Sequence, residues 1–226
     1  MKRIVFFICL LFIFVTACDV GNKENHNETG IDAIIPDGWK ILEKYQGELA
    51  IAEGDLNKDN IPDIAVVIEK KISEEEEAPP RALLIAFGTS NGSYELSIIA
   101  DNVILKADEG GIWGDPFDEL SIDKGSVLVS DYGGSNWRWY NKYRFRFQDE
   151  DWYLIGVTVG SYFTGTHTLE NADEVDYNLL TGDYHIRTTD DDGEIIINKG
   201  NKRRKELIKL REFNLEHLWE LTDVEN

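Results

Sequence analysis

The sequence predicts a mainly β protein made of antiparallel meanders, forming either an incomplete β-propeller-like arrangement or packed sheets, with a short C-terminal helical segment. Two observations support this fold class. From residue 34 onward, short runs of β-branched and aromatic residues alternate with closely spaced Gly, Asn and Asp turns. In addition, 42% of the residues are hydrophobic and 19 Gly stand against only 5 Pro, which is typical of a packed globular body.

The expected strands are runs of four to eleven residues bounded by turn residues. They cover residues 48–53, 64–70, 82–87, 94–99, 119–122, 126–130, 137–147, 152–159, 185–188 and 194–197. Hairpin residues occupy several of the joints, at 90–93, 123–125, 148–151 and 190–193. Because such short turns connect antiparallel neighbours, most adjacent strands are predicted to pair with each other.

One strong helical candidate is present, at residues 202–221. Leu207, Leu210, Leu218 and Leu221 keep a loose helical spacing there, which also suits a broken helix. Residues 73–80, with sequence SEEEEAPP, combine four glutamates with two prolines and are expected to form an exposed loop.

Length and charge narrow the classes of partner. A chain of 226 residues suits one sizeable core or two small ones. Lys and Arg total 23 against 43 Asp and Glu, for a formal net charge of -20, which argues against nucleic-acid binding. Both cysteines, Cys9 and Cys18, precede the folded region, so neither a disulfide nor a cysteine-ligated zinc is expected within it.

The first residues have the pattern of a targeting segment. Lys2 and Arg3 precede the apolar run IVFFICLLFIFV, which is too short to span a bilayer and is typical of a signal-peptide core. Residues 1–17 are therefore predicted to be a lipoprotein signal peptide, residues 18–33 a lipidated flexible tether, and residues 34–226 a single β-rich domain. Cleavage removes two basic residues and no acidic one, so the mature chain is still more acidic.

The residues around the cleavage site specify an anchor. The sequence Val15-Thr16-Ala17-Cys18 resembles the bacterial lipobox, in which the cysteine thiol is diacylated and the chain is cut just before it. The resemblance implies lipidation of Cys18 and a membrane-anchored, extracytoplasmic protein on the cell surface or the periplasmic face. Two acyl chains make such anchoring stable. An ordinary secretory signal that happens to contain a Cys is the alternative.

Residues 54–69, with sequence GDLNKDNIPDIAVVIE, form a candidate metal loop. Asp55, Asn57, Asp59 and Asp63 fall at positions 1, 3, 5 and 9, and the carbonyl of Ile61 stands at position 7. Calcium takes six to eight such oxygen ligands. The spacing therefore predicts a structural Ca²⁺ site, and the alternative is a polar hairpin loop without metal.

This loop resembles the calcium loop of FG-GAP and VCBS repeats, whose usual form is A-x-G-D-x-N-x-D-G-x-x-D-h-x-h. An EF-hand is less suitable, because position 12 is Val66 rather than Glu and both flanks favour strands. The chain departs from the repeat pattern in having Asn60 where glycine is usual, and it contains one copy of the motif. Residues 36–160 are more broadly similar to uncharacterised bacterial VCBS-repeat-like lipoproteins, which implies fold and location only.

The segment 137–147 alternates regularly. Aromatic residues share one face, and the other face carries a basic stripe. The stripe consists of Arg138, Lys142, Arg144 and Arg146. Cross-strand ion pairs with acids on neighbouring strands are the favoured interpretation. The alternative is a docking surface for an anionic envelope polysaccharide, such as a peptidoglycan or teichoic acid segment, or for an acidic protein.

Two Gly-rich segments, 110–117 and 132–137, carry the tryptophans Trp113 and Trp137. We expect β-turns plugged by buried tryptophans. If exposed, these rings would instead be able to stack on sugars.

No catalytic motif can be read from the sequence, so catalysis is not the favoured function. The predicted function is that of a binding or scaffolding module of the cell envelope. One alternative is an extracytoplasmic hydrolase acting on an envelope polymer, with Asp115 and Asp118 as acid and base. A further alternative is an inhibitor or immunity-type lipoprotein, which no particular residue supports.

Overall fold

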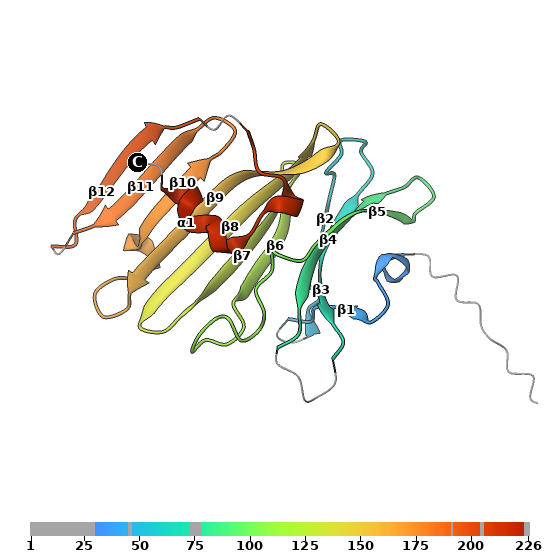
Figure 1. Ribbon diagram of the computed structural model, residues 1–226, viewed down its shortest axis with the longest axis horizontal. Helices are drawn as coiled ribbons and strands as arrows, with labels where there is room; N and C mark the ends of the chain where they lie inside the picture. The colour runs from blue at the N-terminus through green and yellow to red at the C-terminus, as the bar shows by residue number, and fades with distance from the viewer. Residues whose placement is uncertain (1–29, 45–46, 73–77, 191, 204–205, 224–226) are drawn as a thin grey trace, which may run out of the picture.

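The computed structural model describes residues 30–44, 47–72, 78–190, 192–203 and 206–223, and these residues form two antiparallel β-sheets (Figure 1). The mainly β fold class with a short C-terminal helix is confirmed. Of the two arrangements expected, this one corresponds to packed sheets. The expected signal peptide, the lipidation site Cys18, most of the tether and the glutamates of the 73–80 loop lie outside the described residues.

The smaller sheet has five strands. They are β1 (Trp39–Ile41), β2 (Ile51–Gly54), β3 (Asp63–Lys70), β4 (Arg81–Gly88) and β5 (Tyr94–Ala100). The order is β1-β3-β4-β5, and β2 pairs with β3 beyond the end of β1. Strands β3 and β4 are almost continuously apolar because both of their faces are covered.

The larger sheet is a seven-stranded meander in sequence order. Its strands are β6 (Phe117–Asp123), β7 (Ser126–Gly134), β8 (Trp137–Gln148), β9 (Asp151–Phe163), β10 (Asp173–Asn178), β11 (Asp183–Thr189) and β12 (Ile195–Asn201). A short 3₁₀ helix, η3 (Leu169–Asn171), lies between β9 and β10. The longest strands, β8 and β9, are at the centre, so they provide the largest surface of the sheet.

Two tight turns fix the register of the long strands. Lys124 and Gly125 between β6 and β7 both have positive φ, as do Asp149 and Glu150 between β8 and β9. Two consecutive positive φ values match the twist of a two-residue hairpin. Both turns were predicted from the sequence, and they determine which side chains of β8 face outward.

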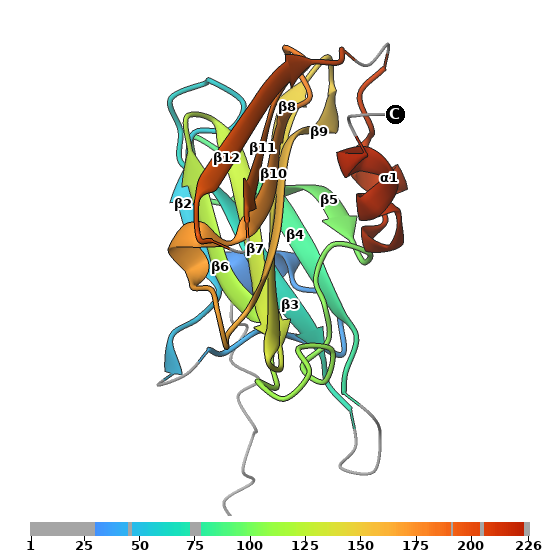
Figure 2. The same ribbon diagram turned by 90° about the vertical axis from the view of Figure 1, so that its left-hand side faces the viewer.

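The main core lies on one face of the seven-stranded sheet, which we call the inner face. There Val129, Tyr143 and Phe145 pack with Leu83 and Ile85 of the smaller sheet. The C-terminal segment covers another part of the same face, as Figures 1 and 2 show. The opposite, outer face has no such cover among the described residues.

A second core lies on the far side of the smaller sheet. Ile64, Val66 and Leu84 pack there against Ile31 and Ile34 of the 3₁₀ helix η1 (Ile31–Ile34). This helix falls within the last residues of the expected tether, so packing begins slightly before residue 34.

The C-terminal helix is much shorter than residues 202–221. Strand β12 continues to Asn201, and in the described part of this segment helical turns occur only at η4 (Leu210–Glu212), η5 (Leu215–His217) and α1 (Leu218–Thr222). Asn214 divides the segment, because its side chain accepts a hydrogen bond from the Glu216 amide and caps η5. No helix among the described residues has the length and hydrophobicity to cross a bilayer.

The ten predicted strands are all present, several with longer bounds, while β1 and β10 were missed. Strand β10 was missed because three acidic residues hide its alternation, in which only Val175 and Tyr177 face the core.

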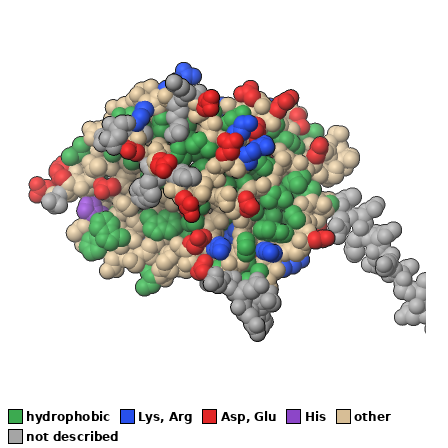
Figure 3. All heavy atoms as spheres, in the orientation of Figure 1, with side chains coloured by type: hydrophobic (Ala, Val, Ile, Leu, Met, Phe, Trp, Pro, Cys, Tyr) green, Lys and Arg blue, Asp and Glu red, His purple; other side chains and the backbone are tan. Residues whose placement is uncertain are grey.

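Acidic and basic side chains are interspersed with hydrophobic ones on the side of the molecule seen in Figure 3.

Candidate functional site

The basic stripe lies on the outer face of the seven-stranded sheet. The alternation predicted for β8 is confirmed, with Tyr143 and Phe145 buried in the inner core. Arg138, Lys142 and Arg144 therefore project from the opposite side, and Arg146 follows them. Tyr132 of β7, which pairs with Tyr140, also faces outward.

Of the expected ion pairs with acids on other strands, one long pair is present within the described residues, between Arg144 Nη1 and Asp123 of β6 at 4.0 Å. The prediction therefore holds for Arg144 alone, and no such pair is formed there by Arg138, Lys142 or Arg146. The register explains this outcome, because neutral residues stand opposite the cations. Ser130 and Thr158 flank Lys142, Leu128 and Gly156 flank Arg144, and Tyr153 pairs with Arg146.

The shorter contacts of the arginines are with uncharged groups. Arg144 Nη1 donates to Ser126 Oγ at 2.9 Å, and Arg146 Nη2 donates to the Gln148 side-chain oxygen at 2.6 Å. The Arg138 guanidinium stacks 4.4 Å from the centre of the Trp113 ring, and its buried Nη1 has no hydrogen-bond partner among the residues that the structure describes. The positive charges of the stripe are therefore largely uncompensated by acids.

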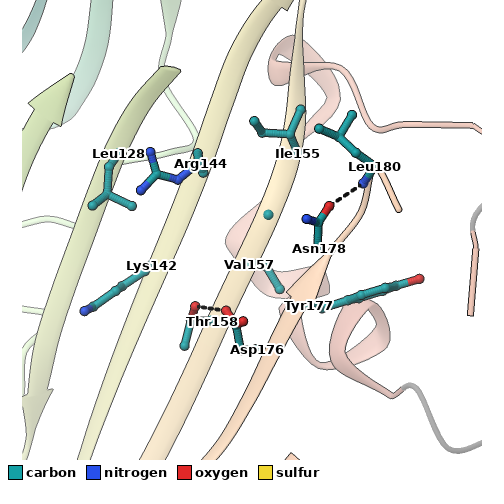
Figure 4. A pocket seen from close by; sticks show the side chains of 11 residues that line it. Leu128, Lys142, Arg144, Ile155, Val157, Thr158, Asp176, Tyr177, Asn178 and Leu180 are labelled. Carbon is teal, nitrogen blue, oxygen red and sulfur yellow. Dashed lines mark hydrogen bonds between the residues drawn. The ribbon is translucent and has the colours of Figure 1, made fainter. Parts of the chain in front are cut away.

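A hollow of about 340 Å³ opens beside the stripe, between Lys142 and Arg144 on one side and Asp176 and Asn178 on the other (Figure 4). Gly156 of β9 also lines it. A Cβ on Gly156 would have no neighbour closer than 3.7 Å, so the absence of a side chain leaves open space there. Lys142 and Arg144 line the hollow on the β8 side, and the β10 side is polar. There Thr158 Oγ1 donates to Asp176 at 2.7 Å.

The two Gly-rich loops meet at one end of this sheet. The Gly134 amide donates to the Gly110 carbonyl at 2.9 Å, and Gly111 bridges to Gly134. Trp113 is 58% exposed and Trp137 is 63% exposed, so the prediction that both tryptophan side chains are buried is wrong. Trp113 packs edge-on to Tyr132 as well as on Arg138, which places an exposed aromatic ring beside the basic stripe.

The candidate calcium loop is wound by hydrogen bonds to its own amides. Asp55 accepts from the amides of Lys58 at 2.6 Å and Asn60 at 3.2 Å, and Asp59 accepts from that of Ile61 at 2.7 Å. Lys58 and Asn60 have positive φ. Asn60 thus takes a left-handed conformation, which glycine adopts most readily and Asn tolerates.

Asp63 differs from the other predicted ligands because its side chain is buried. It is fully buried and accepts from the amides of Leu56 at 2.7 Å, Asn57 at 3.2 Å and Gly88 at 2.8 Å, which ties the loop to the end of β4. Across the described ranges, no three His, Cys, Asp or Glu side chains are grouped closely enough to hold a metal. The loop therefore has the hard oxygen donors that suit calcium, but its carboxylates bond to amides in this conformation.

Asp115 and Asp118 do not resemble a catalytic acid–base pair. Arg81 is nearly buried and donates to both Asp115 oxygens, at 2.7 and 2.6 Å. Burial raises the pKa of Asp115, but the hydrogen bonds from Arg81 and from the Phe117 amide outweigh it and leave that pKa below its usual value. Asp118 accepts from Ser130 Oγ at 2.9 Å.

Asp131 is the titratable residue that the sequence reasoning missed. It is 1% exposed on the inner face of β7, and within the described part of the chain neither carboxylate oxygen has a hydrogen-bond partner of good geometry, although the nearby Tyr143 hydroxyl lowers its pKa. Burial raises its pKa to about 7. A signal was present in the sequence, because Asp131 continues the inward-facing alternation of Val127 and Val129, where a carboxylate is not expected.

No family model, curated protein or solved structure matches this chain, so comparison with known proteins identifies no relative. The similarity to FG-GAP and VCBS repeats therefore stays a prediction from the sequence of the 54–69 loop.

Proposed function

We propose that this protein is a lipid-anchored, extracytoplasmic binding module that holds an anionic envelope polysaccharide on the outer face of its seven-stranded sheet. The observation that carries the proposal is the basic stripe of β8, whose four cations have one carboxylate partner among the described residues, Asp123 at 4.0 Å from Arg144. A stripe serving only to stabilise the sheet would be expected to pair with acids across the strands.

The dimensions of the stripe suit an extended polymer. Arg138 and Arg146 are eight residues apart on one strand, which corresponds to about 27 Å. The hollow over Gly156 lies along this line, and the exposed ring of Trp113 lies near its Arg138 end. Aromatic faces offer contact area to sugar rings, while guanidinium groups bind carboxylates or phosphates in bidentate geometry.

The strongly negative net charge is compatible with this binding surface. At physiological ionic strength, exposed charges more than about 8 Å apart are largely screened, so nearby cations dominate the local interaction. Asp176, the acid that lines the hollow, accepts a hydrogen bond from Thr158. The remaining negative charge would keep the domain away from anionic lipid headgroups, leaving the outer face accessible.

We also propose that calcium stabilises the 54–69 loop, held by Asp55, Asn57, Asp59, the Ile61 carbonyl and Asp63. These are hard oxygen donors of the kind calcium prefers. When bound, the divalent ion would offset two of the three negative charges that Asp55, Asp59 and Asp63 bring to the loop. In this proposal the role of calcium is structural.

The hydrolase alternative receives less support. A general acid must hold a proton near neutral pH. Arg81 instead favours the ionised form of Asp115, one of the two acids expected to act.

Binding is tested with purified full-length protein in detergent and a poly(glycerol phosphate) chain as the anionic probe, measured by titration calorimetry. Lys142→Glu with Arg144→Glu is expected to weaken binding at least about tenfold, because charged hydrogen bonds contribute about 1.5–3 kcal/mol each. Lys70→Glu with Lys71→Glu makes the same charge change at exposed positions on and just after β3 and is expected to leave binding almost unchanged. Equal effects of the two double variants would contradict the proposal.

A further inference from the structure

The free edge of the seven-stranded sheet is apolar. Strand β12 is the last strand of this sheet (Figure 1), and among the described residues no segment pairs with its other side. On this strand Ile195, Ile196 and Ile197 are 49%, 48% and 55% exposed. Exposed edges are usually protected by prolines, charges or bulges. Strand β12 has no proline, carries a single charge on Lys199, and keeps an unbroken register with β11, so its edge is open to a further strand.

The backbone of β12 presents hydrogen-bonding groups to this edge. The Asp190 amide donates to the Glu194 carbonyl at 3.1 Å, and these two residues continue the register between β11 and β12. Hydrogen-bonded pairs alternate with non-bonded pairs along an antiparallel ladder, so every second residue from Glu194 onward bonds to β11. The amides and carbonyls of Ile195, Ile197 and Lys199 therefore point away from the sheet, where another antiparallel strand can bond to them.

The side chains of β12 are complementary to a second copy of the same strand. Residues opposite each other in an antiparallel pair share a face of the sheet, so a twofold dimer places one residue opposite its own copy. When Ile196 takes this position, Ile195 of each copy lies opposite Ile197 of the other. Every exposed isoleucine of the strand then pairs with an isoleucine, in the cross-strand contact that stabilises sheets.

The charges near this edge also favour a second copy. The chain has a formal net charge of -20, so acidic surfaces of two copies repel each other, whereas residues 195–198 carry no charge. In the same register Lys199 lies opposite Gly193 of the copy, between the acidic Asp192 and Glu194. Opposite charges therefore meet at both ends of the pairing, and Lys199 does not face its own copy.

We propose that two copies of this chain associate by antiparallel pairing of their β12 edges, with Ile196 at the twofold axis. The two seven-stranded sheets then form one continuous sheet. Burial of the isoleucines and backbone hydrogen bonds at Ile195 and Ile197 stabilise the pair. Because a twofold interface uses the same edge of both copies, association stops at the dimer. The interface does not depend on the polysaccharide surface, because β9, β10 and β11 separate β12 from the basic stripe.

Sedimentation equilibrium in density-matched detergent tests the dimer, using the full-length chain with Cys9→Ser and Cys18→Ser so that no native thiol contributes. We expect a reversible monomer–dimer equilibrium. Ile196→Lys is expected to weaken dimerisation at least about tenfold, because it sets like charges opposite each other at the axis. The matched control is Ile112→Lys, at an isoleucine that is 82% exposed in the segment between β5 and β6, and it is expected to leave the equilibrium unchanged.

Two cysteine variants in the same background test the register. Ile196→Cys is expected to form an intermolecular disulfide under mild oxidation, because the Cβ atoms of an opposed non-hydrogen-bonded pair lie about 4.5 Å apart. Asn198→Cys points to the same face, but in this register it lies about 13 Å along the strand from its own copy and is expected to stay unlinked.

Several outcomes would overturn the inference. A monomer at every concentration up to the millimolar range would do so, as would assembly that continues beyond the dimer or equal effects of Ile196→Lys and Ile112→Lys. A disulfide at Asn198→Cys in place of Ile196→Cys would contradict the proposed axis. Lys142→Glu with Arg144→Glu is expected to leave the dimer intact, so failure of this proposal is distinguishable from failure of the polysaccharide proposal.

Discussion

Replacement of the buried Asp131 by Asn is expected to change how the stability of the protein depends on pH. The folded state raises the pKa of Asp131 from 3.8 to about 7, chiefly because burial disfavours the charged carboxylate. Between these two values the folded protein binds more protons than the unfolded chain. The contribution of Asp131 to stability is therefore fully present below pH 3.8 and is lost as the pH rises to about 7.

The difference between the two pKa values corresponds to about 4 kcal/mol. Asn cannot ionise, so Asp131→Asn is expected to gain stability relative to the wild type as the pH rises from about 4 to about 8. The absolute stability of the variant also includes the cost of a buried amide. This cost does not change with pH, and the pH dependence of the difference is therefore the informative quantity.

Urea unfolding at intervals between about pH 4 and pH 8 measures this difference. Asp149→Asn, at an exposed turn, controls for the loss of one acidic residue. Parallel stability curves for the wild type and Asp131→Asn would refute the reasoning, and a difference of opposite sign would show that Asp131 is stabilised as a carboxylate in the folded protein.

Three further predictions concern other parts of the molecule. Gly160→Ala is expected to destabilise the fold by about 1–3 kcal/mol in the same urea titration, because the added Cβ would lie 2.1 Å from the Tyr140 ring. Gly156→Ala is the matched control and should be nearly neutral, because its added Cβ would have no neighbour closer than 3.7 Å. Chelation by EGTA is expected to lower the melting temperature of the wild type but not of the variant in which both Asp55 and Asp59 are Asn, and equal curves with and without calcium would reject the metal loop. Cys18→Ser is expected to release the protein from the membrane fraction, and continued retention of the unacylated variant would reject lipid anchoring.

Much of the fold follows from local patterns in the sequence. Strand β8 was predicted within one residue of its observed bounds, because aromatic and basic residues alternate along its length. The turn at Asp149 and Glu150 was predicted because its residues tolerate positive φ. In the C-terminal segment the apolar spacing overstated the helix, since Asn214 interrupts it by capping η5.

The candidate sites were harder to predict because they depend on contacts distant in sequence. Exposure of Trp113 results from the meeting of two Gly-rich loops, and the bidentate pair of Arg81 with Asp115 joins β4 to the segment before β6. Neither contact has a local signal. The scarcity of acidic partners for Lys142 and Arg144, with Asp123 at 4.0 Å from Arg144, likewise depends on strand register, which places neutral residues opposite both cations.

The most direct test of the central proposal is a salt titration of poly(glycerol phosphate) binding to the wild type, with uncharged dextran as the comparison polymer. The account predicts saturable binding of the anionic polymer that weakens steadily as salt is added, with little binding of dextran. Binding of both polymers with no salt dependence, or of neither, would contradict the assignment of the outer face as an anion-binding surface.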